Sequence, residues 1–434
     1  MSYLIDTFTT IFWGLIMFSL IVFVHEAGHY TAARLCGMRV REFMLGLPGP
    51  NIGITIGDTK YGVTPILLGG YALIAGMQYE SESPTLAQSL ALLAEVGRIE
   101  TNEVLSLERR LGYDLEGDLD QLADWGTIRR SKSKTPSETG TFSYEMVKSG
   151  RDSGSGSEVR GVSDAQALLE TERKKTYLGA SYAKRVVMLV TGAVFNLLFA
   201  IVVFTTAMML IGEVRTTTTV DAVASESPAE VAGMLPGDKL IAIDGHEIFA
   251  WEEVYDYIGQ CQPGQEIVIT VLRDEQPLEL QLVLADNNGR GYMGVTIAVE
   301  EVPVAFGDAF TRSIGFIGEV AVGIMGLFNP ATFGEVLQSS SSVVGISVEA
   351  SNAASAGFWP FIVLAAALSI SIGLMNLLPF PPLDGGKILV ETIQRVTKRK
   401  IPMRVVNSIT VFVLVLFSIL FVVLTWQDIR NYIM

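Results

Sequence analysis

A His-Glu-x-x-His pentapeptide, His25 to His29, lies at the end of a long apolar segment that begins near Ile11. On a helix the two histidines lie on one face about one turn apart, so both imidazoles can bind one divalent metal ion. Glu26 can then reach a water molecule on that metal. A helix rises about 1.5 Å per residue, so His25 lies roughly 21 Å from Ile11, within a bilayer core about 30 Å thick. A metal ion at this position would act on its substrate inside the membrane.

The composition indicates a membrane protein with substantial aqueous parts. Of the 434 residues, 49% are hydrophobic and 18% are charged. This is too apolar for an ordinary soluble enzyme and too charged for a chain that lies entirely in the membrane. We expect a multi-pass α-helical membrane protein with four spans. These spans lie around residues 11–35, 186–211, 361–378 and 405–424.

Two apolar segments need separate interpretation. The first span lacks the positive charges that precede a cleavable signal peptide, since Asp6 is the only ionisable side chain before it. We therefore expect it to remain in the mature protein. The segment 306–328 is apolar but short and contains Glu319, so we expect an interfacial helix and not a fifth span.

Charged residues predict which loops face the cytoplasm. Arginines and lysines follow the first span, precede the second and separate the third from the fourth, as is typical of cytoplasmic loops. Residues 213–319 contain nineteen acidic and five basic residues, which account for nearly all of the net charge of −15. We expect this segment and both termini to be extracytoplasmic. Cys36 and Cys261 then lie on opposite sides of the membrane and cannot form a disulfide bond.

Residues 40–77 predict a small β-structure against the membrane. The alternating run at 52–56, a turn at Gly57-Asp58 and the run at 61–64 are typical of a hairpin. Backbone polar groups at membrane depth must be paired or line a water-filled cavity. This segment either offers an edge to an extended peptide or is only a structural hairpin.

Residues 80–175 are polar and indicate an insert between the first two spans. Three helical patterns end at Gly97, Gly112 and Gly126, and two strand-like runs follow on either side of a turn at 134–136. Three short helices and a basic hairpin are similar to a winged-helix module, which binds DNA or protein partners in other proteins. We expect a cytoplasmic partner for the insert and not nucleic acid. The Ser-Gly repeat at 153–157 predicts a flexible linker.

The acidic segment contains Pro236-Gly237-Asp238, followed by Ile243-Asp244-Gly245. A helix is predicted at 251–258, and strands are predicted at 267–272 and 278–284. This pattern resembles a PDZ domain over residues 214–299, an α+β fold that binds a peptide as an added strand. The resemblance implies control of substrate access or a structural plug.

A third metal ligand must come from outside the pentapeptide. Only three histidines are present, and His246 lies in the PDZ-like segment, so the third ligand should be a carboxylate or a thiolate. Asp384 follows the third span in the sequence Asn-Leu-Leu-Pro-Phe-Pro-Pro-Leu-Asp-Gly-Gly, which covers residues 376–386. The prolines end the helix near the membrane, and the two glycines permit a sharp turn that can aim Asp384 inward.

Two asparagines in the spans are further candidates. Asn376 lies at a depth similar to that of His25, where it can donate to an oxyanion or to a peptide backbone, or only pack between helices. Gly192 and Asn196 have the spacing of a close helix contact in the second span, and Asn196 can face the same cavity.

Together, His-Glu-Ala-Gly-His, Gly-x-x-x-Asn and Leu-Asp-Gly-Gly resemble the site-2 protease family, specifically the bacterial RseP-like intramembrane metalloproteases with one PDZ domain. The resemblance implies that His25, His29 and Asp384 bind Zn²⁺, and that Glu26 acts as general base and then as general acid. It implies cleavage within or near the transmembrane segment of single-span proteins, such as anti-sigma factors or signal-peptide remnants. It also implies a location in the bacterial inner membrane. Lys387 departs from the family, in which a histidine is common at this position.

Two other functions fit part of the pattern. One is a membrane-anchored zinc protease with aqueous substrates, whose third ligand is usually a downstream glutamate. The other is a catalytically inactive PDZ-bearing membrane scaffold, which an intact His-Glu-x-x-His with Leu-Asp-Gly argues against. The expected domains are the first span with its β-structure (1–79), the insert with its linker (80–175), the second span (176–213), the PDZ domain (214–299), interfacial helices (300–357), and the third and fourth spans (358–434).

Overall fold

The computed structural model describes residues 2–67, 69–78, 81–132, 142–147, 159–287 and 289–432. The turn predicted at 134–136 and the linker predicted at 153–157 lie outside these residues. The chain divides into two compact units. The first unit contains Met1–Val203 and Ser313–Met434, and the second contains Phe204–Arg312.

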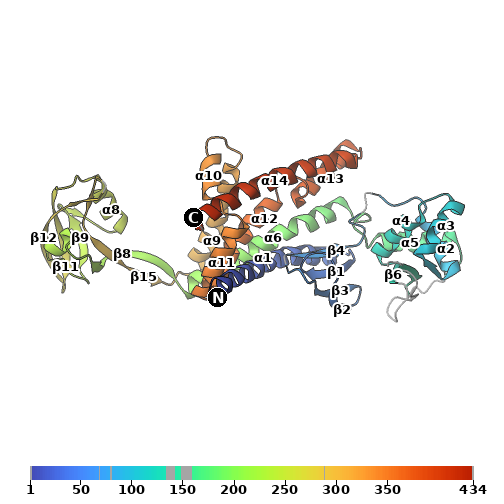
Figure 1. Cartoon of the computed structure of the whole chain (residues 1–434), viewed down its shortest axis with the longest axis horizontal. Helices are drawn as coiled ribbons and strands as arrows, with labels where there is room; N and C mark the ends of the chain where they lie inside the picture. The colour runs from blue at the N-terminus through green and yellow to red at the C-terminus, as the bar shows by residue number, and fades with distance from the viewer. Residues whose placement is uncertain are drawn as a thin grey trace. The chain divides into compact units, whose positions relative to one another are not determined.

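Long helices form the centre of the first unit (Figure 1). They are α1 (Ser2–Leu35), α6 (Tyr182–Leu210), α12 (Phe358–Asn376) and α14 (Met403–Tyr432). The shorter α11 (Val343–Ala356) packs against α1 and α12, where Met17, Ile21, Ala350, Phe361 and Ala365 are buried together. Because α12 lies beside α1, its C-terminal end is near the pentapeptide. The remaining helices of this part are α10 (Phe333–Ser339) and α13 (Asp384–Thr397).

Within the described part of the chain, five helices are long and apolar enough to be candidate membrane spans, one more than the four expected. The fifth is α9 (Phe306–Gly326), for which we expected an interfacial helix. It is continuous for 21 residues, which is about 32 Å at 1.5 Å per residue. Asp308 and Arg312 lie near its first turn, and Glu319 is the only ionisable residue in the rest of the helix.

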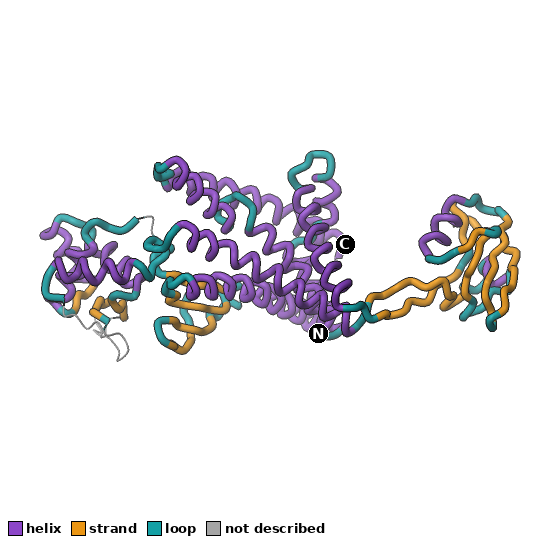
Figure 2. Tube along the Cα trace, turned by 180° about the vertical axis from the view of Figure 1, so that it is seen from behind, coloured by secondary structure: helices purple, strands orange, loops and turns teal. Residues whose placement is uncertain are grey.

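A small sheet follows α1. Its strands are β1 (Val40–Leu45), β2 (Ile52–Ile56), β3 (Thr59–Val63) and β4 (Gly70–Ile74), in the order β2-β3-β1-β4. β1 and β3 are parallel, and the other pairs are antiparallel. β4 is an edge strand and contacts α1 (Figure 2). At the other edge, Ile52, Ile54 and Ile56 are exposed, as suits strands in contact with lipid.

The insert folds around its own apolar core. Its elements are α2 (Leu86–Val96), β5 (Arg98–Glu100), α3 (Thr101–Leu111), α4 (Leu115–Trp125), β6 (Ile128–Lys132), β7 (Phe142–Met146) and α5 (Val162–Arg173). The sheet order is β5-β7-β6, so β6 and β7 form a hairpin and β5 completes the sheet. α3 and α4 both end at left-handed glycines, Gly112 and Gly126. Leu90, Leu119 and Trp125 are buried at the centre.

The second unit contains a six-stranded sheet and helices, and five of the strands lie side by side. Its order is β12-β11-β9-β8-β15, and β10 pairs with β9. The elements are β8 (Glu213–Val223), α7 (Pro228–Val231), β9 (Lys239–Ile243), β10 (His246–Glu247), α8 (Trp251–Gln260), β11 (Glu266–Arg273), β12 (Gln276–Val283), β13 (Ala285–Asn287), β14 (Arg290–Tyr292) and β15 (Val295–Val302). An ion pair between Asp238 and Arg273 fixes the start of β9 against the end of β11. Burial raises the pKa of Asp238, but hydrogen bonds from Arg273 and from the Leu235 amide outweigh this effect and hold that pKa below its ordinary value.

Candidate metal centre

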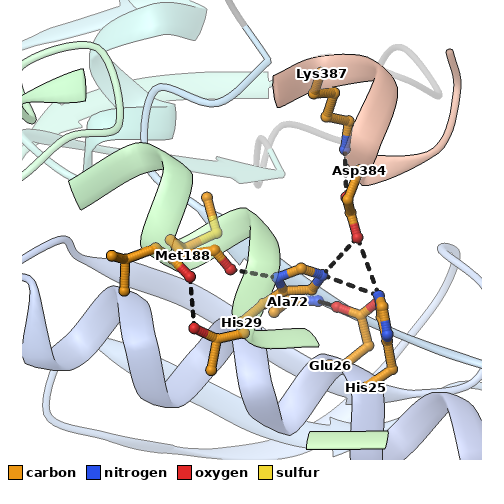
Figure 3. Close-up of polar contacts among 9 residues, drawn as sticks. His25, Glu26, His29, Ala72, Met188, Asp384 and Lys387 are labelled. Carbon is orange, nitrogen blue, oxygen red and sulfur yellow. Dashed lines mark hydrogen bonds and ion pairs between the residues drawn. The ribbon is translucent and has the colours of Figure 1, made fainter. Parts of the chain in front are cut away.

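Three potential metal ligands converge from two distant parts of the chain. His25 and His29 lie one turn apart on α1, and Asp384 is the first residue of α13. His25 Nε2 lies 3.1 Å from Asp384 Oδ2. His29 Nε2 lies 3.0 Å from the same oxygen and 3.0 Å from His25 Nε2 (Figure 3). All three side chains are buried.

The hydrogen bond at the other side of the His29 ring identifies its tautomer. His29 Nδ1 lies 2.8 Å from the Met188 carbonyl oxygen, and because a carbonyl only accepts, Nδ1 carries the hydrogen. In the neutral ring, Nε2 therefore directs a lone pair toward the Asp384 oxygen. Two electron-rich atoms at this distance repel each other unless a proton or a metal ion lies between them. Two imidazole nitrogens and one carboxylate oxygen form a ligand set that Zn²⁺ accepts in catalytic sites, with the fourth position open.

The sequence around Asp384 explains how it reaches the histidines. α12 ends at Asn376, and Pro379, Pro381 and Pro382 keep the following residues from continuing the helix. A Cβ atom on Gly385 would collide with the Leu377 carbonyl oxygen, and one on Gly386 would collide with the Pro381 nitrogen. Only glycine permits this close return of the chain.

A second pair of glycines brings α6 against the histidines. A Cβ atom on Gly28 would overlap the Thr191 carbonyl oxygen of α6. A Cβ atom on Gly192 would lie 2.6 Å from His29 Nε2 and 2.8 Å from His25 Cε1. The sequence indicated a close helix contact at Gly192, but not that this contact is made with both imidazoles.

Glu26 lies in the same cavity as the three ligand candidates. This cavity has a volume of about 350 Å³, and Tyr71, Asn376 and Lys387 also line it. The Ala72 amide of β4 donates a 2.9 Å hydrogen bond to Glu26 Oε2. Glu26 is therefore held between the histidines and the edge strand. Sequence analysis missed Ala72 and Met188 because both act through backbone atoms, which no residue type reveals.

The two candidate asparagines have different positions. Asn376 lines the cavity with Glu26 and the histidines. Asn196 is fully buried and packs near Gly373 of α12, and it is not among the described residues that line the cavity. Its side-chain oxygen and nitrogen have no hydrogen-bond partner among the described residues.

Two further polar groups border the site. Lys387 Nζ lies 3.5 Å from Asp384 Oδ1, so the two carboxylate oxygens of Asp384 face different partners. Burial and a hydrogen bond to Glu42 raise the pKa of Tyr71 to about 12. Tyr71 therefore remains a hydroxyl donor throughout the neutral pH range.

Comparisons with known proteins find a matching family, similar sequences and similar solved structures. A family model described as Peptidase family M50 matches residues 13–421. Zinc metalloprotease RasP of Oceanobacillus iheyensis is 26% identical over 455 residues, covering 98% of this chain and 99% of that protein. Zinc metalloprotease RasP of Geobacillus kaustophilus is 25% identical over 446 residues, covering 99% and 100%. A solved PDZ domain of the SdrC-like protein of Listeria monocytogenes is 24% identical and covers 18% of this chain and 85% of that one, with a TM-score of 0.18.

Proposed function

Because the chain belongs to Peptidase family M50, we propose that it is an intramembrane zinc metalloprotease of the site-2 type. Its substrates are single-span membrane proteins, cleaved within or near the transmembrane segment. The observation that carries this proposal is the convergence of His25, His29 and Asp384 within 3.1 Å of one another beside Glu26.

In this mechanism His25, His29 and Asp384 hold the zinc ion. Bound zinc supplies an activated water and polarises the scissile carbonyl. Glu26 accepts the proton of the attacking water and passes it to the leaving nitrogen. The Ala72 amide keeps the Glu26 carboxylate in position, and the Asn376 carboxamide can donate to the peptide oxygen as it gains charge.

The edge strand β4 suits an extended substrate. A peptide carbonyl in a helix is already hydrogen-bonded, so a transmembrane helix must unwind before hydrolysis. An extended segment can then pair with β4, beside the Glu26 carboxylate. The PDZ-like unit contributes to substrate access. Anti-sigma factors and signal-peptide remnants are the substrates that the family resemblance favours.

The metal site also constrains the topology. The basic loops favour a cytoplasmic position for the C-terminal end of α1, the insert and the turn between α13 and α14 in a bacterial membrane. The PDZ-like unit is then extracytoplasmic. For Asp384 to meet His25, α12 must cross the membrane in the same direction as α1. The chain between α6 and α12 must therefore begin and end on the extracytoplasmic side. α11 has only 14 residues, too few to cross a bilayer core. We infer that α9 enters or lies along the outer leaflet without a complete crossing.

A substitution of Glu26 tests the catalytic assignment. Glu26→Gln should keep one zinc ion per chain and abolish cleavage of a single-span reporter, because it removes the base and leaves the ligands. His25→Ala should lose the zinc. Metal content of the purified protein and reporter cleavage in vesicles measure both. An inactive scaffold would bind no zinc, and undiminished cleavage by Glu26→Gln would remove Glu26 from the mechanism.

A further inference from the structure

A second cavity of about 570 Å³ adjoins the metal cavity. The two share Ala72, Ile74, Met77, Pro382 and Lys387, so they lie on either side of the same wall residues. The second cavity extends away from the histidines, between β4 on one side and α13 with the first turns of α14 on the other. Because β4 is an edge strand, a peptide paired with it would direct alternate side chains into this space.

The lining of the second cavity has an excess of positive charge. Arg185, Lys387 and Lys400 line it, against one carboxylate, Glu391. Glu391 already accepts a hydrogen bond from the Tyr177 hydroxyl, and its other oxygen lies 3.4 Å from Arg185 Nε. The negative charge of Glu391 is therefore balanced by Arg185 in the wall of the cavity.

Two lysines remain to act on an occupant. Lys387 is near Asp384 Oδ1, but Asp384 faces the metal cavity, and its Oδ2 belongs to the ligand set. Lys400, an exposed residue between α13 and α14, also lines the cavity, and it has no hydrogen-bond or ion-pair partner among the described residues. An occupant thus meets the Lys400 ammonium group, which has no carboxylate partner among the described residues, and the Lys387 ammonium group, whose described carboxylate contact is Asp384 Oδ1 at 3.5 Å.

We propose that this cavity is a charge-selective subsite for the substrate residues beside the scissile bond. It accepts acidic and neutral polar side chains and rejects lysine and arginine. This inference rests on the proposed function, since it assigns the cavity to the substrate of the metal site.

Rejection by like charge has a consequence for substrate choice. Most single-span proteins carry lysines and arginines at the cytoplasmic end of their transmembrane segment. A cation-lined subsite near that end disfavours such proteins as substrates without any contact specific to the correct one. The protease would thereby select membrane segments whose cytoplasmic flank is acidic or uncharged next to the cut.

The test is a reporter series in which one flanking residue is Glu, Gln or Lys. The substitution is repeated at each of the four positions on the cytoplasmic side of the scissile bond. For at least one position, the wild-type protein should cleave the Glu reporter about two- to fivefold faster than the Lys reporter, in kcat/KM at physiological salt. Lys400→Glu should abolish or reverse this preference. Arg399→Glu is the matched control, because Arg399 is adjacent and exposed but does not line the cavity. It should keep the preference.

Binding of uncleaved peptides separates this inference from the proposed function. Fluorescent peptides that carry Glu, Gln or Lys at the same flanking position are titrated onto the Glu26→Gln protein. The Glu peptide should bind most tightly, the Gln peptide less tightly and the Lys peptide least tightly. If this order is found but the wild-type protein cleaves none of the reporters, the subsite stands and the protease assignment fails. Equal cleavage of all three reporters at every position would overturn the subsite, and so would an equal effect of Arg399→Glu and Lys400→Glu. The protease assignment would survive both results.

Discussion

Gly192 has no side chain, yet it lies against both histidines of the metal centre. It occupies the point where α6 crosses α1 opposite Gly28, so the backbones of the two helices touch. This contact also brings the Met188 carbonyl to His29 Nδ1, where it fixes the tautomer. The orientation of the imidazoles therefore depends on small residues in the neighbouring helix as well as on α1 itself.

Gly192→Ala should weaken zinc binding about 10- to 100-fold, because the added methyl group would lie 2.6 Å from His29 Nε2 and must displace the ring. Competition with a chelator of known affinity measures the change. Gly318→Ala is the control, since a Cβ atom there meets nothing within 4 Å. Zinc affinity that is the same in both variants would show that the ring tolerates the shift.

At the scale of elements, the insert is attached to the small sheet whose edge strand β4 holds the Glu26 carboxylate. Arg41 of β1 donates a 2.7 Å hydrogen bond to the Ala123 carbonyl at the C-terminal end of α4. The Gly76 amide, just after β4, donates to Asp124 at 2.6 Å. Cations at a helix C-terminus are favourable because its carbonyls carry partial negative charge. These two hydrogen bonds therefore connect the insert to the sheet within a few residues of Ala72.

The helix that a winged-helix module would present to DNA is acidic here. α4 contains Glu116, Asp118, Asp120 and Asp124, and it contains no lysine or arginine. Such a helix is unsuited to a phosphate backbone. Its C-terminal end instead contacts the membrane-associated sheet of the same chain. The charge of α4 therefore does not favour nucleic acid as a ligand of the insert.

Glu172 of α5 makes this attachment sensitive to acid. Burial raises the pKa of Glu172, but hydrogen bonds from Lys175 and Arg39 outweigh it and lower that pKa below its ordinary value. A carboxyl group with a lowered pKa stabilises the folded state above the unfolded pKa, and this contribution disappears as the pH falls through the folded pKa. The attachment should therefore be fully stabilised at neutral pH and weaken below about pH 4.

Glu172→Gln should cost about 1–3 kcal/mol at pH 7, because the largely buried Arg39 loses its buried carboxylate partner and keeps only the exposed Asp58, at 3.3 Å from its Nε. Thermal unfolding of the purified protein measures the difference from wild type, which should shrink as the pH approaches 3. Glu170→Gln, at an exposed position of the same helix, is the control. A difference that does not change with pH would contradict the role of the Glu172 charge.

At the scale of the whole molecule, the metal centre joins residues separated by 355 and 359 positions in the sequence. Ligands on α1 and α13 can meet only if the chain crosses the membrane an even number of times between the ends of α1 and α12. In the proposed topology the insert and the turn between α13 and α14 share one side of the membrane, and the PDZ-like unit is on the other.

Protease treatment of membrane vesicles tests this topology. In inverted vesicles the insert should be cut and the PDZ-like unit protected, and right-side-out vesicles should give the opposite result. Antibodies to an epitope in each part identify the fragments. An insert that is protected in inverted vesicles would overturn the proposed orientation and, with it, the placement of the charge-selective subsite.

The sequence alone indicated the metal ligands by residue type, because His-Glu-x-x-His depends on local helix geometry and Leu-Asp-Gly-Gly on local backbone freedom. It also indicated the apolar helices, the small sheet and the insert, since each has its own periodicity or composition. It gave the wrong number of long apolar helices, because a single charge such as Glu319 does not prevent a continuous helix of 21 residues.

Only the tertiary structure decided which atoms meet. The Ala72 amide, the Met188 carbonyl and the approach of Gly192 to the imidazoles involve backbone atoms, which are the same in every residue and leave no pattern in a sequence. The same holds for the second cavity, whose walls come from β4, α6, α13 and α14. Its charge is a sum over residues that are distant in the chain, and their packing in three dimensions alone brings them to one space.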